Sequence, residues 1–163
     1  MGGDTAGEGS DWFSGQVIDN SDGRQVAVLA QQYDEDLYAK QIYCLGLHYN
    51  QALVGVETNF STYPTKELER LEYPRLYVRE VEDTYTGRLR QGYGFETTRR
   101  TNPIIIGQPV EIVREDAWAV VDGETLGEML TYSRLEDGKT GALDGEHDDR
   151  VMALAIAYYI RTQ

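Results

Sequence analysis

The chain has 163 residues, enough to bury a continuous hydrophobic core as one domain without structural staples. Its one cysteine, Cys44, excludes an internal disulfide and gives no sign of an oxidised, secreted protein. The longest apolar run, near 151–160, is too short to span a bilayer, and the first residues do not resemble a signal peptide. We therefore expect a soluble, cytoplasmic protein that does not contact a membrane.

A formal charge of −13 opposes nucleic-acid binding, because contacts to phosphate require lysine and arginine. The segment RLRQGYGFETTRR (88–100) nevertheless holds four arginines against one glutamate. This run fits a basic contact surface, although a solvated loop also explains it. Much of the acidity lies elsewhere, at 34–36 and 144–149, and the second of these clusters is a candidate cation site.

The first third of the chain predicts a hairpin and a long helix. The segments GQVID (15–19) and QVAVLAQQY (25–33) are typical of two strands joined by the turn NSDGR. Little chain precedes Asp4, so a strand leading into it is almost absent, and we interpret Met1 as replacing the end of a longer chain. A helix is expected over 34–50, because acidic residues favour its start and apolar residues follow a helical stripe. The stripe comprises Leu37, Ile42, Leu45 and Leu47.

A crossover of strand, helix and strand is predicted next. ALVGVE (52–57) is a short apolar run, as expected of a strand covered on both faces, and Glu57 closes it. A helix over 65–71 and the strand RLYVRE (75–80) would complete a right-handed parallel crossover. Polar and aromatic residues then alternate over 82–95, which favours a hairpin or a flexible ribbon.

The second half predicts helices separated by short extended pieces. A helix is expected over 102–114, with Pro103 in its first turn. WAVVD (118–122) is predicted to be extended, ETLGEML to be a short helix, and TYSRLE to be a strand that enters the turn DGKTG. The last helix should run from about Glu146 to Ile160. Without internal repeats or a linker, residues 1–163 are predicted to form one α/β domain with a mixed central sheet flanked by helices.

Acidic residues recur where these elements end or begin. Asp4 precedes a glycine-rich loop, Glu57 ends the apolar strand, and Asp148 and Asp149 open the final helix. Ligands of open α/β sheets gather beyond the carboxyl ends of the strands, so these groups are expected to converge. Carboxylate oxygens are the ligands that Mg²⁺ prefers. The set therefore predicts a divalent-cation site.

Each acidic residue also has a structural explanation. Asp148 and Asp149 suit the dipole of a helix N-terminus, and Asp4 could cap a turn, whereas a glutamate that ends a buried strand needs a partner. Small side chains in the final helix, at Ala153 among others, should let its backbone approach the sheet and bring its first turn to the strand ends. We rank Asp149 slightly above Asp148 as the group that points inward.

Four segments in this order resemble the C-terminal nuclease domain of the large terminase subunit of tailed bacteriophages. They are DTAGEGSDW, ALVGVETN, GYGFETTRRTNP and TLGEMLTYSRLEDGKTGALDGEHDDRVMALAIA. The resemblance implies an RNase H-like fold and metal-dependent cleavage of concatemeric double-stranded DNA during genome packaging in the host cytoplasm. The family's ATPase motor has no counterpart here, since the phosphate-binding motif G-x-x-x-x-G-K-[ST] does not occur. The parent protein would then supply this motor and contact the small terminase subunit and the portal, while an isolated domain should be a monomer.

The resemblance also assigns roles to residues. It implies a catalytic and metal-binding triad of Asp4, Glu57 and either Asp149 or Asp148, serving two Mg²⁺ or Mn²⁺ ions. Two ions about 3.5–4 Å apart can hold one phosphate, activate water and stabilise the leaving 3′ oxygen. Asp11 is implied as an auxiliary carboxylate; His147 could orient water or contact a metal, although capping is its commoner role. The phosphate-binding side chains would be Arg88, Arg90, Arg99 and Arg100.

Two other functions fit the same residues. Another RNase H-like nuclease, such as a Holliday-junction resolvase or an integrase-type recombinase, would share the carboxylate cluster. A docking module that kept the fold and lost the chemistry would contact the portal or the motor. Two further residues receive no catalytic role: Cys44 is expected to be a small core residue of its helix, and His48 a structural one.

Overall fold

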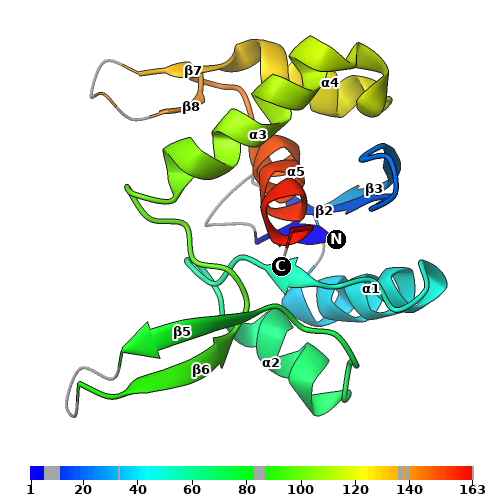
Figure 1. Cartoon of the computed structure of the whole chain (residues 1–163), viewed down its shortest axis with the longest axis vertical. Helices are drawn as coiled ribbons and strands as arrows, with labels where there is room; N and C mark the ends of the chain where they lie inside the picture. The colour runs from blue at the N-terminus through cyan, green and yellow to red at the C-terminus, as the bar shows by residue number, and fades with distance from the viewer. Residues whose placement is uncertain (6–11, 33, 83–86, 136–137, 139, 163) are drawn as a thin grey trace.

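The computed structural model describes residues 1–5, 12–32, 34–82, 87–135, 138 and 140–162, so Asp11 lies outside the described residues. Within these ranges a four-stranded mixed sheet has the order β3-β2-β1-β4 (Figure 1). Its strands are β1 (Gly2–Asp4), β2 (Phe13–Ile18), β3 (Gln25–Gln31) and β4 (Gly55–Val56). The predicted hairpin over 15–33 is therefore confirmed as β2 and β3, which pair antiparallel.

The first strand is present, although the sequence analysis expected it to be almost absent. β1 is short, but it lies inside the sheet, antiparallel to β2 and parallel to β4. The hydrogen bonding between the two strands continues one residue past the end of β4, because the Glu57 amide donates to the Gly3 carbonyl at 2.8 Å. Three residues suffice here because a neighbouring strand pairs with each edge of β1.

Helices cover both faces of the sheet. The helices are α1 (Glu35–His48), α2 (Tyr63–Arg70), α3 (Asn102–Glu115), α4 (Gly123–Thr131) and α5 (Asp149–Ile160); α2 packs on α1, and α3 and α4 pack on α5. A Cβ at Gly15 of β2 would meet Ile42 of α1 at 2.8 Å, while the next residue, Gln16, donates to the Arg150 carbonyl of α5 at 3.3 Å. Successive strand residues face opposite sides, so α1 and α5 lie on opposite faces of the sheet.

The close approach expected of the last helix is found between α5 and β1. A Cβ placed on Gly2 would lie 2.1 Å from the Ala153 carbonyl oxygen and 2.4 Å from the Ala157 nitrogen. The two backbones would be held apart by any side chain larger than glycine at Gly2, or by one bulkier than alanine at Ala153 or Ala157. α5 begins at Asp149, three residues later than the predicted start at Glu146.

The predicted apolar stripe of α1 is wrong in part. Leu37 and Leu47 are exposed, whereas the buried face consists of Tyr38, Ala39, Ile42 and Gly46. The reason is a close contact: a Cβ at Gly46 would lie 2.3 Å from the Tyr73 hydroxyl, so a glycine is needed where the helix meets this ring. Cys44 is exposed, which overturns the prediction that it packs in the core.

Two antiparallel ribbons extend from the domain on the same side in Figure 1: β5 (Val78–Glu82) with β6 (Leu89–Tyr93), and β7 (Tyr132–Arg134) with β8 (Thr140–Ala142). The hairpin expected over 82–95 is present with an earlier start: β6 lies in the predicted segment, whereas β5 begins at Val78, and residues 83–86 lie outside the described residues. The predicted parallel strand at 75–80 is confirmed only at Leu76, which bridges to Val54, because the chain then turns into β5.

The segment predicted to be extended at 118–122 instead begins within a 3₁₀ helix, η1 (Ala117–Ala119). Asp116 caps this turn by accepting the Trp118 amide at 3.0 Å, which explains the helical start. In the described part of the chain, no helix combines the length and apolar character needed to cross a membrane.

Candidate active site

Asp4 and Glu57 lie side by side because β1 and β4 run parallel and end together. Asp4 is the last residue of β1, and Glu57 directly follows β4. Both are buried, with 6 % and 4 % of their surface exposed. The convergence of these two residues beyond the strand ends, expected from the sequence, is therefore present in the structure.

A cavity of about 330 Å³ opens at these strand ends. Its acidic lining residues are Asp4, Glu57, Glu146, Asp148 and Asp149, and His147 lines it as well. We call it the acidic cavity. It brings together all the carboxylates proposed from the sequence that the structure describes, and it adds Glu146, which had been assigned only to a helix start. The signal for Glu146 was its place in the 144–149 acidic cluster.

The acidic cavity is electrostatically unfavourable as it stands. Burial raises the pKa of Asp4 well above its usual value, and the charge and hydrogen bond of Glu57, then the charges of Asp149 and Asp148, raise it further. Burial, followed by the charges of Asp4 and Glu57, likewise raises the pKa of Tyr38 well above its usual value. A bound cation or proton would relieve this repulsion.

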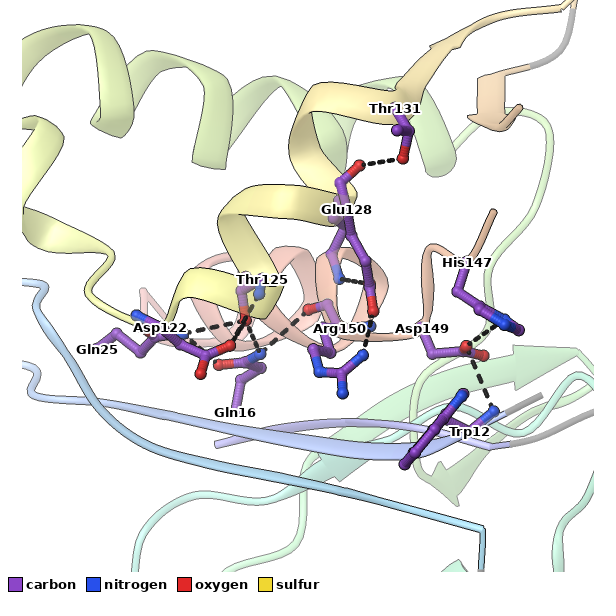
Figure 2. Close-up of polar contacts among 11 residues, drawn as sticks. Trp12, Gln16, Gln25, Asp122, Thr125, Glu128, Thr131, His147, Asp149 and Arg150 are labelled. Carbon is purple, nitrogen blue, oxygen red and sulfur yellow. Dashed lines mark hydrogen bonds and ion pairs between the residues drawn. The ribbon is translucent and has the colours of Figure 1, made fainter. Parts of the chain in front are cut away.

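Asp149 is held at the cavity by contacts from two chain segments, the residue before β2 and the loop before α5 (Figure 2). Its Oδ2 accepts the Trp12 amide at 3.3 Å and lies 3.6 Å from His147 Nδ1. Asp149 is 7 % exposed, whereas Asp148 is half-buried and its Oδ2 accepts the Ala142 amide at 3.2 Å. Asp149 is thus the more deeply buried of the pair, as ranked from the sequence.

The start of α5 is capped by a residue from another helix. Glu128 of α4 accepts the amides of Arg150 and Val151 through Oε2 at 2.8 and 3.3 Å. Its other oxygen accepts Arg150 Nη1 at 2.5 Å, and the Arg150 guanidinium lies 5.2 Å above the Trp12 ring. Glu128, Arg150 and Trp12 therefore surround the backbone that presents Asp149 (Figure 2).

A buried polar network extends this support into the sheet. Gln16 Nε2 donates to Thr125 Oγ1 at 3.0 Å, and its Oε1 accepts Gln25 Nε2 at 2.7 Å. Gln25 Oε1 accepts the amides of Val121 and Asp122. This network was not predicted from the sequence; its signal was glutamine inside the strand segments 15–19 and 25–33.

The predicted phosphate-binding arginines are exposed but do not all lie at the acidic cavity. Arg88 precedes β6 and Arg90 lies within it, on the first ribbon. Arg99 and Arg100 lie on the loop before α3, and Arg99 lines a second cavity that shares Thr97 and Asn102 with the acidic cavity. The loop thus lies next to the site, whereas the ribbon residues do not line either of the two cavities.

The donor set of the acidic cavity fits hard divalent cations, because carboxylate oxygens are their preferred ligands and the charges of Glu57, Asp149 and Asp148 act against ionisation of the buried Asp4. Among the described residues, no three aspartate, glutamate, histidine or cysteine side chains are grouped so that they could hold one ion together. Mg²⁺ does not require such a group, since it is commonly bound by one or two carboxylates together with water and substrate phosphate.

The mixed sheet, the helix layers and the buried carboxylates at the strand ends define an α/β domain with a candidate cation-dependent active site. Among the solved structures it resembles are two crystal structures of the large terminase nuclease from thermophilic phage G20c. One gives a TM-score of 0.71 at 19 % identity, covering 97 % of this chain and 79 % of that one. The second, with bound magnesium, gives 0.72 at 18 % identity, covering 97 % and 78 %.

The fold is therefore that of a phage large terminase nuclease, as the resemblance in the sequence predicted. At this level of identity the likeness concerns the fold, and it leaves the roles of individual residues to chemical argument. No protein-family model matches the sequence. A comparison with curated proteins also gives no match.

Proposed function

We propose that the chain is a metal-dependent endonuclease domain with an RNase H-like fold, which cleaves double-stranded DNA during packaging of a phage genome. The observation that carries this proposal is the convergence of Asp4, Glu57 and Asp149, all buried, in one cavity at the strand ends. Mutual repulsion among buried carboxylates is costly, and cation binding is the use that offsets this cost. The likeness to a nuclease structure solved with magnesium supports the same reading.

Asp4, Glu57 and Asp149 would hold the ions, with Asp148 contributing from the rim of the acidic cavity. When bound, two divalent ions, Mg²⁺ or Mn²⁺, would supply charge that activates the attacking water and stabilises the leaving 3′ oxygen. The chain's own task is to fix the carboxylates before the substrate arrives. Glu128 and Arg150 do this for the start of α5, and the β1 and β4 ladder does it for Asp4 and Glu57.

His147 is placed to influence Asp149 and the water near it. Its Nδ1 lies 3.6 Å from Asp149 Oδ2, and its ring lines the acidic cavity. We assign it an auxiliary role in orienting the carboxylate or the attacking water. Replacement by asparagine should therefore slow cleavage less than replacement of Glu57.

The arginines would supply sequence-independent affinity for DNA. Arg88, Arg90, Arg99 and Arg100 are exposed, and contacts from arginine to phosphate position a duplex without reading its bases. The charge of −13 makes binding by this domain alone weak, so the motor domain, the small terminase subunit and the portal would add grip in the assembled packaging machine of the host cytoplasm.

Plasmid digestion tests this function. The chain should linearise and then degrade supercoiled plasmid with Mg²⁺ or Mn²⁺ and do nothing with chelator. Asp4→Asn and Glu57→Gln should abolish cutting, whereas Glu111→Gln, on the exposed side of α3, should retain it. Persistent cutting by both site variants would remove the proposed active site, and a strong preference for four-way junctions would replace packaging with a resolvase function.

A further inference from the structure

A second cavity lies against the acidic one and has the opposite character. Its volume is about 550 Å³, and its lining includes Arg99, Arg134 and the threonines Thr97, Thr98 and Thr140. Among the described residues, no carboxylate lines it. We call it the arginine cavity. Such a surface is unexpected by composition, because acidic residues outnumber basic ones by 28 to 15 in this chain.

Both arginines are available to an anion. Their side chains are exposed, and no ion pair joins Arg99 or Arg134 to a carboxylate in the described part of the chain. By contrast, Arg70, Arg79 and Arg150 are each paired with a glutamate. A guanidinium left without an acidic partner, beside threonine hydroxyls, matches the geometry and charge of phosphate.

The two arginines come from separate elements whose relative position is fixed. Thr140 Oγ1 of β8 donates to Asn102 Oδ1 at the start of α3 at 2.8 Å, and the Tyr132 hydroxyl of β7 donates to the same threonine at 3.2 Å. These bonds join the ribbon that carries Arg134 to the helix that follows Arg99. The spacing of the two chain segments that carry Arg99 and Arg134 is therefore built into the fold.

The loop that carries Arg99 is also braced. Asn59 receives the Thr97 amide on Oδ1 at 2.9 Å and donates Nδ2 to the Thr97 carbonyl at 2.5 Å. The Thr98 amide donates to Thr101 Oγ1 at 2.8 Å. These bonds fix the backbone on both sides of the residue, which lowers the entropy lost when Arg99 binds an anion.

The acidic and arginine cavities are neighbours that share Thr97 and Asn102. A duplex carries one charge for about every 3.4 Å of rise along each strand, so a strand with one phosphate at the carboxylates places further phosphates nearby. We propose that the arginine cavity binds the sugar-phosphate backbone beside the scissile phosphate, through Arg99 and Arg134. This inference rests on the proposed nuclease function. It adds Arg134 to the DNA-binding residues and places the DNA strand along a path from the acidic cavity to the arginine cavity.

The two cavities should respond differently to metal. Without divalent ions the acidic cavity repels phosphate, whereas the arginine cavity attracts it with or without metal. DNA binding measured in chelator therefore excludes the contribution of bound metal, and the comparison of wild type with R99A/R134A then reports the arginine cavity. At low ionic strength the double variant R99A/R134A should bind a labelled 25-base-pair duplex at least about tenfold more weakly than the wild type, by fluorescence anisotropy.

The salt dependence gives a sharper readout than the affinity. Loss of two phosphate contacts should reduce the slope of log K against log salt by about 1.8, because each contact contributes about 0.9. The control R24A/R114A removes the same charge from exposed positions outside both cavities and should leave the slope unchanged. R99K/R134K should restore most of the slope, and circular dichroism establishes that every variant folds.

Cleavage assays separate this inference from the function on which it rests. With Mn²⁺, R99A/R134A should raise KM and leave kcat close to that of the wild type. If R99A/R134A and its control show equal salt slopes while the wild type cuts DNA in a Glu57-dependent manner, DNA binding by the arginine cavity is refuted and the nuclease function stands. If the wild type binds DNA through Arg99 and Arg134 but does not cut it, the nuclease function is refuted and the DNA-binding surface stands.

Discussion

Glu128→Ala tests how the start of α5 is held at the acidic cavity. The Glu128 side chain is 8 % exposed, that of Arg150 is 13 % exposed, and the carboxylate accepts three hydrogen bonds from the first turn of α5. Removing one partner of a buried pair costs about 3–5 kcal/mol. Because Arg150 keeps some contact with water, we expect about 3 kcal/mol. At about 2–4 °C per kcal/mol for a domain of this size, Tm should fall by roughly 6–12 °C.

Thermal unfolding followed by circular dichroism in chelator measures this effect. The matched control is Glu124→Ala, an exposed glutamate in the first turn of the same helix, which should cost less than about 1 kcal/mol. Glu128→Ala should also weaken Mn²⁺ binding, because the backbone that presents Asp149 loses its cap. Equal Tm values for the two variants would refute the capping argument.

Two further predictions concern pH and packing. The pKa of Asp4 is raised in the folded chain, so the stability that its protonated form contributes is lost as pH rises from the ordinary value of about 3.9 through the raised pKa. Asparagine cannot ionise at this position. In chelator, the Tm of Asp4→Asn should therefore increase relative to that of the wild type between pH 4 and pH 8. A Tm difference between Asp4→Asn and the wild type that stays constant or shrinks with rising pH would contradict the raised pKa. Glu111→Gln, the same carboxylate-to-amide change at an exposed position, is the control. Gly2→Ala should destabilise the fold by about 3 kcal/mol or more, because its Cβ would lie 2.1 Å from the Ala153 carbonyl oxygen. Gly127→Ala, at an open position on α4, should instead stabilise the fold by up to about 1 kcal/mol. Similar denaturant midpoints for Gly2→Ala and Gly127→Ala would contradict the close contact between β1 and α5.

The central site could be predicted from the sequence because strand direction and chain order determine it. A short apolar strand that ends in Glu57, followed by a helix, places its carboxyl end beside that of a parallel neighbour. Asp4 and Glu57 converge for that reason, although β1 has only three residues. The last helix was predictable from its small residues, and its burial against β1 follows from them.

The parts that were missed depend on contacts between distant segments. Glu128 lies on a short helix where a glutamate is ordinary, and its role as the cap of α5 appears only once α4 and α5 meet. Arg134 is one basic residue in a short strand, and its pairing with Arg99 across one cavity depends on the contact between β8 and α3. The face of α1 was misjudged because the leucines of a helix were weighed above Tyr38 and Gly46.

Calorimetric titration of the metal-free chain with Mn²⁺ tests the central claim most directly, because it asks whether the buried carboxylates bind cations at all. The account predicts saturable binding that Glu57→Gln and Asp4→Asn abolish or weaken at least about tenfold, while Glu111→Gln binds as the wild type does. Binding that is absent in the wild type, or that both site variants retain unchanged, would contradict the account and leave the domain as a docking module with the fold of a nuclease.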